Sequence, residues 1–149
     1  METYAFCLLP NHFHLLVRVK EAGATPHEEA TLLANAGTQF HRLFTSYAKA
    51  INKRENRVGS LFQRPFKRIQ INSTDYLSNL VYYIHSNPQN HGIIDDFRQY
   101  PWSSYNGIIA GKPTKLQKDS VMNWFGGKED YIDFHKAKAN FNGLVILED

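Results

Sequence analysis

Two histidines separated by one residue, His12 and His14, are the side chains in this sequence best suited to bind one metal ion together. They lie at the start of an apolar run, residues 13–19, that predicts a β-strand. Because alternate side chains of a strand project from the same face, both imidazoles are expected to point the same way and to share a divalent cation. The competing interpretation is a half-buried strand whose solvent-exposed face carries two polar residues.

A second group of reactive side chains lies in a predicted helix that begins at an N-cap, Thr74, and runs to about Asn87, where Pro88 is expected to end it. Tyr83 and Asn87 are four residues apart and therefore stacked on one flank of this helix. Tyr76 falls on the same flank, where a side chain can reach a neighbouring strand and stay partly exposed to solvent, as a nucleophile requires. Asn87 has two interpretations of equal weight: an amide ligand for Mg²⁺ or Mn²⁺, or a C-terminal helix cap.

The rest of this helix divides into a core side and a solvent side. Its apolar stripe is expected to face the core and consists of Leu77, Leu80, Val81 and Ile84. Tyr82 falls nearly opposite that stripe and is predicted to lie on the surface. His85 is rotated by roughly 200° from Tyr83, too far to act as its base, and is interpreted as a structural or DNA-contacting residue.

The remaining pattern predicts strands at the N-terminus, a long helix, a further strand and short C-terminal helices. These elements are expected at residues 4–9 and 13–19, from His27 onward, at 61–71 and within 119–138. Gly37 weakens the long helix, where a break is possible, and Pro65 interrupts the strand over 61–71.

The length of 149 residues and a hydrophobic share of 42% fit one soluble globular domain over residues 1–149. No apolar run approaches the roughly 18 residues that cross a bilayer, so no membrane partner is expected. Cys7 is alone and cannot form an internal disulfide. It is predicted to be a small buried hydrophobe, consistent with the cytoplasm.

Positive charge is concentrated between Arg42 and Arg68, where Glu55 is the one anion and the net charge is +7, against −4 for the remainder. Such a distribution favours a polyanion as partner over a solvated charged helix. The predicted DNA-binding cations are Arg42, Lys49, Lys53, Arg54, Arg57, Arg64, Lys67 and Arg68. Candidates for stacking on unpaired bases, with core packing as the alternative, are Phe62, Phe66, Tyr100, Trp102 and Tyr105.

Several motifs in order along the chain resemble the REP-associated tyrosine transposases, relatives of the single-tyrosine insertion-sequence transposases of the HUH superfamily. Leu-Pro-Asn-His12-Phe-His14-Leu-Leu resembles the His-hydrophobic-His metal motif, and the run from Tyr83 to Pro88 resembles the Tyr-Ile-x-x-Asn-Pro segment. Residues 47–67, 100–105 and 124–134 match further family patterns, so the resemblance covers essentially the whole chain.

The resemblance implies an α+β fold, a ferredoxin-like α/β sandwich with an antiparallel sheet. The family's first strand and helix are expected to be absent because Met1 lies so near His12. The sheet would then expose an edge able to pair in a homodimer.

It also implies His12 and His14 as ligands of Mg²⁺ or Mn²⁺, Asn87 as the third ligand and Tyr83 as the nucleophile. The implied activity is cleavage and rejoining of single-stranded, hairpin-forming DNA through a 5′-phosphotyrosine, in the cytoplasm at the nucleoid. The alternative is a DNA-binding protein that has lost catalysis and holds palindromic hairpins.

Overall fold

The computed structural model describes residues 1–19, 26–62, 66–71, 73–74 and 76–140. Contacts divide the chain into two compact units. The first, called the sheet unit, comprises Met1–Arg18 and Asn72–Asp149; the second, called the basic unit, comprises Val19–Ile71. The single domain expected over residues 1–149 stays a prediction.

The described elements are two strands, a 3-10 helix (η1) and α-helices. In chain order they are β1 (Glu2–Leu8), β2 (Phe13–Arg18), α1 (Pro26–Arg54), α2 (Leu77–Asn90), η1 (Phe97–Gln99), α3 (Tyr105–Ile109), α4 (Lys118–Phe125) and α5 (Lys128–Asn140). The two N-terminal strands and the short helices near the C-terminus are confirmed.

Strands β1 and β2 form an antiparallel hairpin, which in the described residues is a two-stranded sheet. The turn between them is closed by a hydrogen bond from the Leu9 N–H to the His12 carbonyl oxygen (2.8 Å). The register places Cys7 of β1 opposite His14 of β2. The predicted α+β class is confirmed, and the ferredoxin-like layout stays a prediction.

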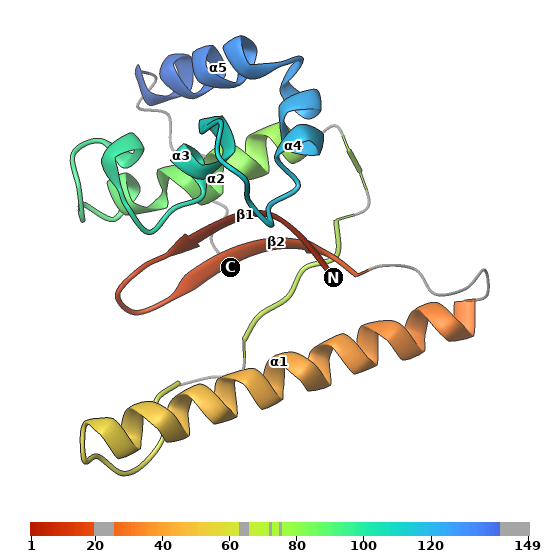
Figure 1. The fold of residues 1–149 in the computed structure, drawn as a ribbon, viewed down its shortest axis with the longest axis vertical. Coiled ribbons are helices and arrows are strands. Elements are labelled where there is room, and N and C mark those ends of the chain that lie inside the picture. The colour runs from red at the N-terminus through yellow and green to blue at the C-terminus, as the bar shows by residue number, and fades with distance from the viewer. Residues whose placement is uncertain (20–25, 63–65, 72, 75, 141–149) are drawn as a thin grey trace. The chain divides into compact units, whose positions relative to one another are not determined.

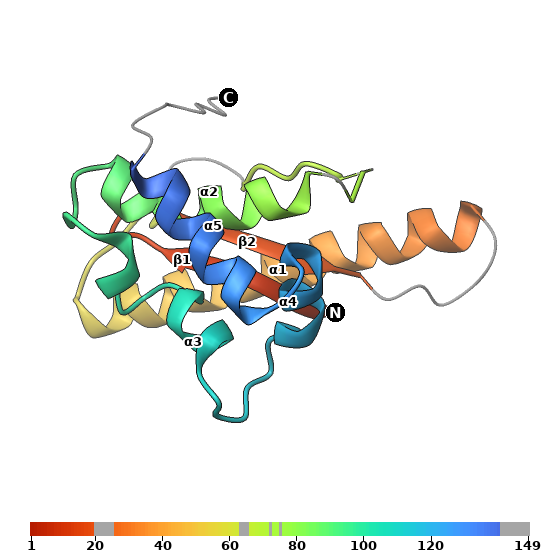
Figure 2. The same cartoon turned by 90° about the horizontal axis from the view of Figure 1, so that it is seen from above.

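The helices of the sheet unit cover one face of this hairpin, as Figure 1 shows with α2 to α5 on the same side of β1 and β2. Seen from above in Figure 2, α2 and α5 lie over the strands. Val81 and Ile84 of α2 are buried in the core together with Ala5 and Cys7 of β1, which confirms the apolar stripe. Burial raises the pKa of the Cys7 thiol to about 11, so this cysteine is a buried small hydrophobe, as predicted.

Helix α2 begins and ends later than the sequence pattern predicts. Its N-cap is Tyr76, and Thr74 contributes a carbonyl oxygen that accepts a hydrogen bond from the Leu77 N–H (3.1 Å), so the predicted cap is wrong. Pro88 lies inside the helix, which continues to Asn90. The predicted end is wrong because a proline this near the terminus disturbs only the last turn, where few backbone bonds depend on it.

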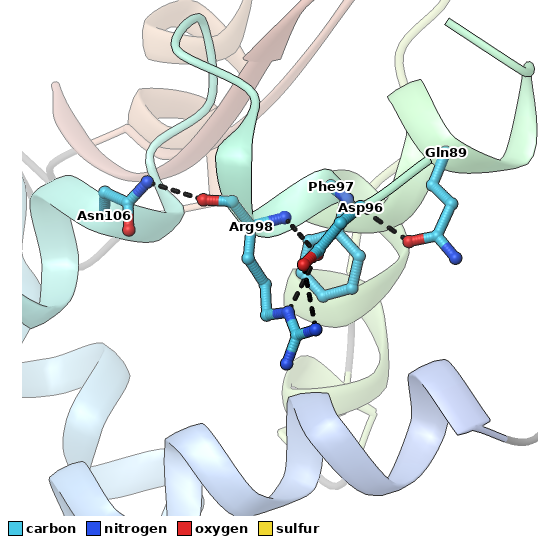
Figure 3. Close-up of polar contacts among 5 residues, drawn as sticks. All are labelled: Gln89, Asp96, Phe97, Arg98 and Asn106. Atoms are coloured by element: carbon cyan, nitrogen blue, oxygen red, sulfur yellow. Dashed lines mark hydrogen bonds and ion pairs between the residues drawn. The ribbon is translucent and has the colours of Figure 1, made fainter. Parts of the chain in front are cut away.

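Polar contacts that return to α2 fix the segment after it (Figure 3). Gln89 in the last turn accepts a hydrogen bond from the Phe97 N–H (3.2 Å). Asp96 caps η1 by accepting from the Arg98 N–H (3.0 Å) and pairs with the Arg98 guanidinium (2.8 Å). Asn106 of α3 donates to the Arg98 carbonyl oxygen (2.7 Å). These contacts hold Phe97 in the core and fix the end of α2.

The basic unit consists of α1 and an irregular segment after it. Helix α1 is continuous through Gly37, where a Cβ would lie 2.7 Å from Nη1 of Arg68; glycine makes room for this guanidinium. The described residues 61–62 and 66–71 form no strand, so the predicted strand is wrong, and Pro65 lies outside the described residues. A strand needs a hydrogen-bonded neighbour, and here the described neighbour is a helix.

None of the helices in the described ranges combines the length and the apolar character that crossing a bilayer requires.

Candidate active site

His12 and His14, called the histidine pair below, come together at the start of β2. Their ring centroids lie 5.1 Å apart with the planes perpendicular, so both imidazoles project to the same side, as the strand period predicts. Asn11 Oδ1 lies 2.7 Å from His12 Nδ1 and accepts a hydrogen bond from it when that nitrogen is protonated. His12 Nε2 then keeps a free lone pair.

Tyr83 of α2 lies against this pair. Its ring centroid is 5.5 Å from that of His14, in an edge-to-face arrangement. Asn87, one turn further along α2, is buried and donates from Nδ2 to the Tyr83 carbonyl oxygen (2.7 Å). The Asn87 side chain also lies near enough to His14 to act on the pKa of that ring. The structure therefore brings together all four side chains predicted for the metal and nucleophile sites.

Asn87 is not a helix cap. It lies within α2, and the C-cap residue is His91, whose backbone N–H donates to the Asn87 carbonyl oxygen (3.0 Å). The capping interpretation is wrong because the helix passes through Pro88. The Asn87 amide is left facing the Tyr83 carbonyl and the His14 ring.

His91 belongs to the same cluster and was not predicted. Its ring centroid lies 5.1 Å from that of His12, and its side chain is exposed. Tyr83, Asn87 and His91 follow one another at intervals of four residues, so they lie along one flank of α2. This spacing was visible in the sequence, but a helix expected to end at Pro88 excludes the next turn.

Burial and neighbouring imidazoles both favour neutral rings in the histidine pair. The pKa of His12 is lowered by burial and by the nearby His91. The pKa of His14 is lowered by burial first and then by His12, against a smaller opposing effect of the hydrogen bond with Asn87. Neutral imidazoles present lone pairs, which is the state that binds a cation.

The donors present fit a divalent metal ion. His14 Nε2 is buried and has no hydrogen-bond partner in the described structure. A buried polar atom without a partner costs free energy that an ion or a substrate would recover. No three His, Cys, Asp or Glu side chains among the described residues are grouped as ligands of one metal ion. A third protein ligand would therefore come from another residue type, and Asn87 is the adjacent amide.

Tyr82 and His85 lie on the other flank of α2, and Tyr82 differs from expectation. Tyr82 is half-buried against Phe97, Phe134 and His135, so its predicted place on the surface is wrong. Burial raises the pKa of its phenol. The reason is α5, which packs over this flank and could not be inferred from helix periodicity.

His85 is completely buried, so the structural interpretation is confirmed and the DNA-contacting one is wrong. Its Nδ1 lies 3.1 Å from His135 Nε2, and its Nε2 lies 2.8 Å from Ser104 Oγ. His135 Nδ1 in turn lies 2.7 Å from the Tyr131 carbonyl oxygen. Burial is the main cause that lowers the pKa of His85 well below its usual range.

The predicted DNA-binding cations belong to the basic unit, and those described are exposed. They are Arg42, Lys49, Lys53, Arg54, Arg57, Lys67 and Arg68, and Arg64 lies outside the described residues. Arg54 pairs with the exposed Glu55 (2.6 Å), an interaction of small energy at this exposure.

The aromatic candidates divide between core and surface. Tyr100 and Tyr105 are buried in the core of the sheet unit, and the Tyr100 hydroxyl donates to the Leu8 carbonyl oxygen (2.8 Å), so the core interpretation holds for both. Trp102 is 63% exposed. In the basic unit, Phe62 and Phe66 pack against Phe44 of α1, each with centroids 5.3 Å apart, and Phe62 is still 37% exposed.

In the sheet unit, Tyr83 of the helix α2 therefore lies against the His-x-His pair at the start of β2. The chain is 33% identical over 113 residues to a protein of Haemophilus influenzae named "Putative REP-associated tyrosine transposase". This match confirms the predicted resemblance to that family. It covers 74% of this chain and 62% of the relative, so the chain spans less than two thirds of that protein's length. No family model and no solved structure matches the chain.

Proposed function

We propose that this protein is a metal-dependent single-stranded DNA transposase that cleaves and rejoins hairpin-forming DNA through a 5′-phosphotyrosine at Tyr83. The observation that carries the proposal is the position of the Tyr83 ring, 5.5 Å from the ring of His14, with His12 next to it. The name of the relative, which refers to REP elements, supports palindromic DNA as the substrate.

The histidine pair and Asn87 would hold the metal ion, with water and a phosphate oxygen in its open positions. Two imidazoles and one amide suit Mn²⁺ somewhat better than Mg²⁺. Such an ion, when bound, neutralises charge on the scissile phosphate and orients it. The chain itself fixes the ligands: β2 sets the pair side by side, and Asn11 holds the His12 ring through Nδ1.

The reaction exchanges one phosphoester for another. Tyr83 Oη forms a bond to phosphorus while the bond from phosphorus to the 3′-oxygen breaks, leaving a free 3′-hydroxyl. The phenol gives its proton to solvent and the 3′-oxygen takes one from solvent. Because the ester formed is similar in energy to the ester broken, the step is reversible and suits strand transfer.

The basic unit would hold the phosphate backbone. Its exposed cations provide the sequence-independent part of the affinity, which falls with salt. Phe62, partly exposed in the same unit, is a candidate for stacking on unpaired bases.

The test is a covalent adduct assay with a labelled hairpin oligonucleotide and Mn²⁺. Wild-type protein and Tyr82→Phe should give a protein–DNA adduct that survives denaturation, and Tyr83→Phe should give none. Tyr82 is the matched control because it is the adjacent phenol, half-buried on the other flank of α2. Hairpin binding with no adduct from the wild type would instead support the DNA-binding protein without catalysis.

A further inference from the structure

His91 is held in a fixed position at the end of α2. It is the C-cap residue, and its N–H donates to the Asn87 carbonyl oxygen (3.0 Å). The next residue, Gly92, has a positive φ of 66° and donates to the Gln89 carbonyl oxygen (3.0 Å), which ends the helix. The His91 side chain is thus aimed by a closed helix end rather than by a free loop.

The His91 ring faces His12 and is open to solvent. Its plane makes an angle of 78° with the His12 ring at a centroid distance of 5.1 Å, and the residue is exposed. No group of three histidines or acidic residues within the described ranges has the arrangement of a metal site. His91 therefore lies beside the histidine pair, and its exposed ring is open to a molecule that enters the site.

We propose that His91 is a substrate-contacting residue that donates a hydrogen bond from its imidazole to an oxygen of the DNA phosphate at the cleavage position. This inference rests on the proposed function, since the phosphate must lie at the histidine pair. Tyr83 and His91 are eight residues apart on one flank of α2, so a phosphate placed against the pair has the phenol on one side and this imidazole on the other.

A simpler role would be packing alone, in which the His91 ring contacts the His12 ring and holds it in position. The two roles differ in what they require: packing needs an aromatic ring, whereas a phosphate contact needs an N–H donor. His91→Phe keeps the ring and removes the donor. His91→Gln keeps a donor and removes the ring. His41→Ala, an exposed histidine on α1, is the control for loss of a distant imidazole.

The experiment measures the rate of adduct formation on the labelled hairpin and the Mn²⁺ concentration that gives half of that rate. His91→Phe and His91→Ala should slow the adduct by about tenfold or more, as expected for loss of a hydrogen bond to a charged group. His91→Gln should recover part of the rate. The half-saturating Mn²⁺ concentration should stay within twofold of the wild type in all three variants.

Two results would overturn the inference and leave the proposed function standing. A wild-type rate in His91→Phe would reduce the residue to a packing role. A rise in the half-saturating Mn²⁺ concentration as large as that of His12→Ala would make it a metal ligand. Failure of the wild-type protein to form any adduct would overturn both proposals together.

Discussion

The two flanks of α2 carry the same kinds of side chain but differ in what packs against them. One flank presents Tyr83 and His91 to the histidine pair of β2. The other presents Tyr82 and His85 to His135 of α5. Each flank therefore has a phenol and an imidazole beside further imidazoles.

The difference lies in hydrogen-bond saturation. Both ring nitrogens of His85 have partners, His135 and Ser104, and the ring is fully buried. His14 Nε2 is buried without a partner. A saturated buried network stabilises the fold and has no capacity left for a ligand, whereas an unpaired nitrogen on a ring that packs against a tyrosine is a site for one. The comparison teaches that saturation, more than residue type, separates a core cluster from a reactive one.

The largest effect is expected from a change at the reactive flank, the flank of α2 that carries Tyr83 and His91. His12→Ala should slow adduct formation by about 100- to 1000-fold, since metal stabilisation of a phosphoryl transfer is worth several kcal/mol. Hairpin affinity should stay within a few-fold, because phosphate contacts elsewhere dominate it. Adduct kinetics measure the rate, and a binding titration measures the hairpin affinity. An unchanged rate would remove His12 from the metal site.

The core flank is the flank of α2 that carries Tyr82 and His85. Here Tyr82→Ala should lower the free energy of unfolding by about 2–3 kcal/mol, because the ring packs against Phe97, Phe134 and His135. Tyr82→Phe keeps the ring and should lose far less. Urea unfolding of both variants measures the difference. Equal loss in the two would mean that the hydroxyl, not the packing, is what matters there.

Acid should lower the free energy of unfolding over a defined pH range, because His135 beside the core flank is buried. Burial lowers the pKa of His135 to about 4, while an unfolded chain has an ordinary histidine pKa near 6.5. Between these values the unfolded state binds more protons than the folded state. The contribution of His135 to the free energy of unfolding is therefore complete above about pH 6.5 and declines as the pH falls toward 4. From pH 7 to 5.5, His135 alone should remove about 1 kcal/mol of unfolding free energy.

His135→Gln, which cannot take up that proton, should lose less stability than the wild type between pH 7 and 5.5. Urea unfolding in the presence of a chelator at both pH values measures this difference without a metal contribution. The same pH dependence in both proteins would contradict the assignment of the acid sensitivity to the buried pair.

The smallest effect concerns binding and should leave both flanks of α2 untouched. Replacing Arg42, Arg57 and Lys67 with Ala should reduce the slope of log affinity against log salt by about two for single-stranded DNA, if each contacts a phosphate. The matched control replaces three exposed lysines of the sheet unit, Lys112, Lys128 and Lys136. Equal changes in slope from the two triple variants would remove the basic unit from the interface.

Local periodicity accounts for what could be predicted. The two-residue period of a strand places His12 and His14 on one face, and the helical period separates Tyr83 from the core stripe of Val81 and Ile84. Both follow from backbone geometry within a few residues. The family resemblance, confirmed by the curated relative, rests on motifs of similar length.

The helix ends could not be predicted from the same pattern, because tertiary contacts override the local signals there. Thr74 has the side chain of a good cap and Pro88 that of a helix breaker, but packing and the polar contacts around Phe97 carry α2 from Leu77 to Asn90. The additional turn is what brings His91 into the site.

The sequence by itself determined the elements that carry chemistry and the side of each element on which a residue lies. The tertiary structure alone decided what covers each side: α5 buries Tyr82 and saturates His85, and β2 brings an unsaturated imidazole to Tyr83. The physical reason is that backbone geometry repeats every few residues, whereas burial and hydrogen-bond partners come from segments far apart in the chain.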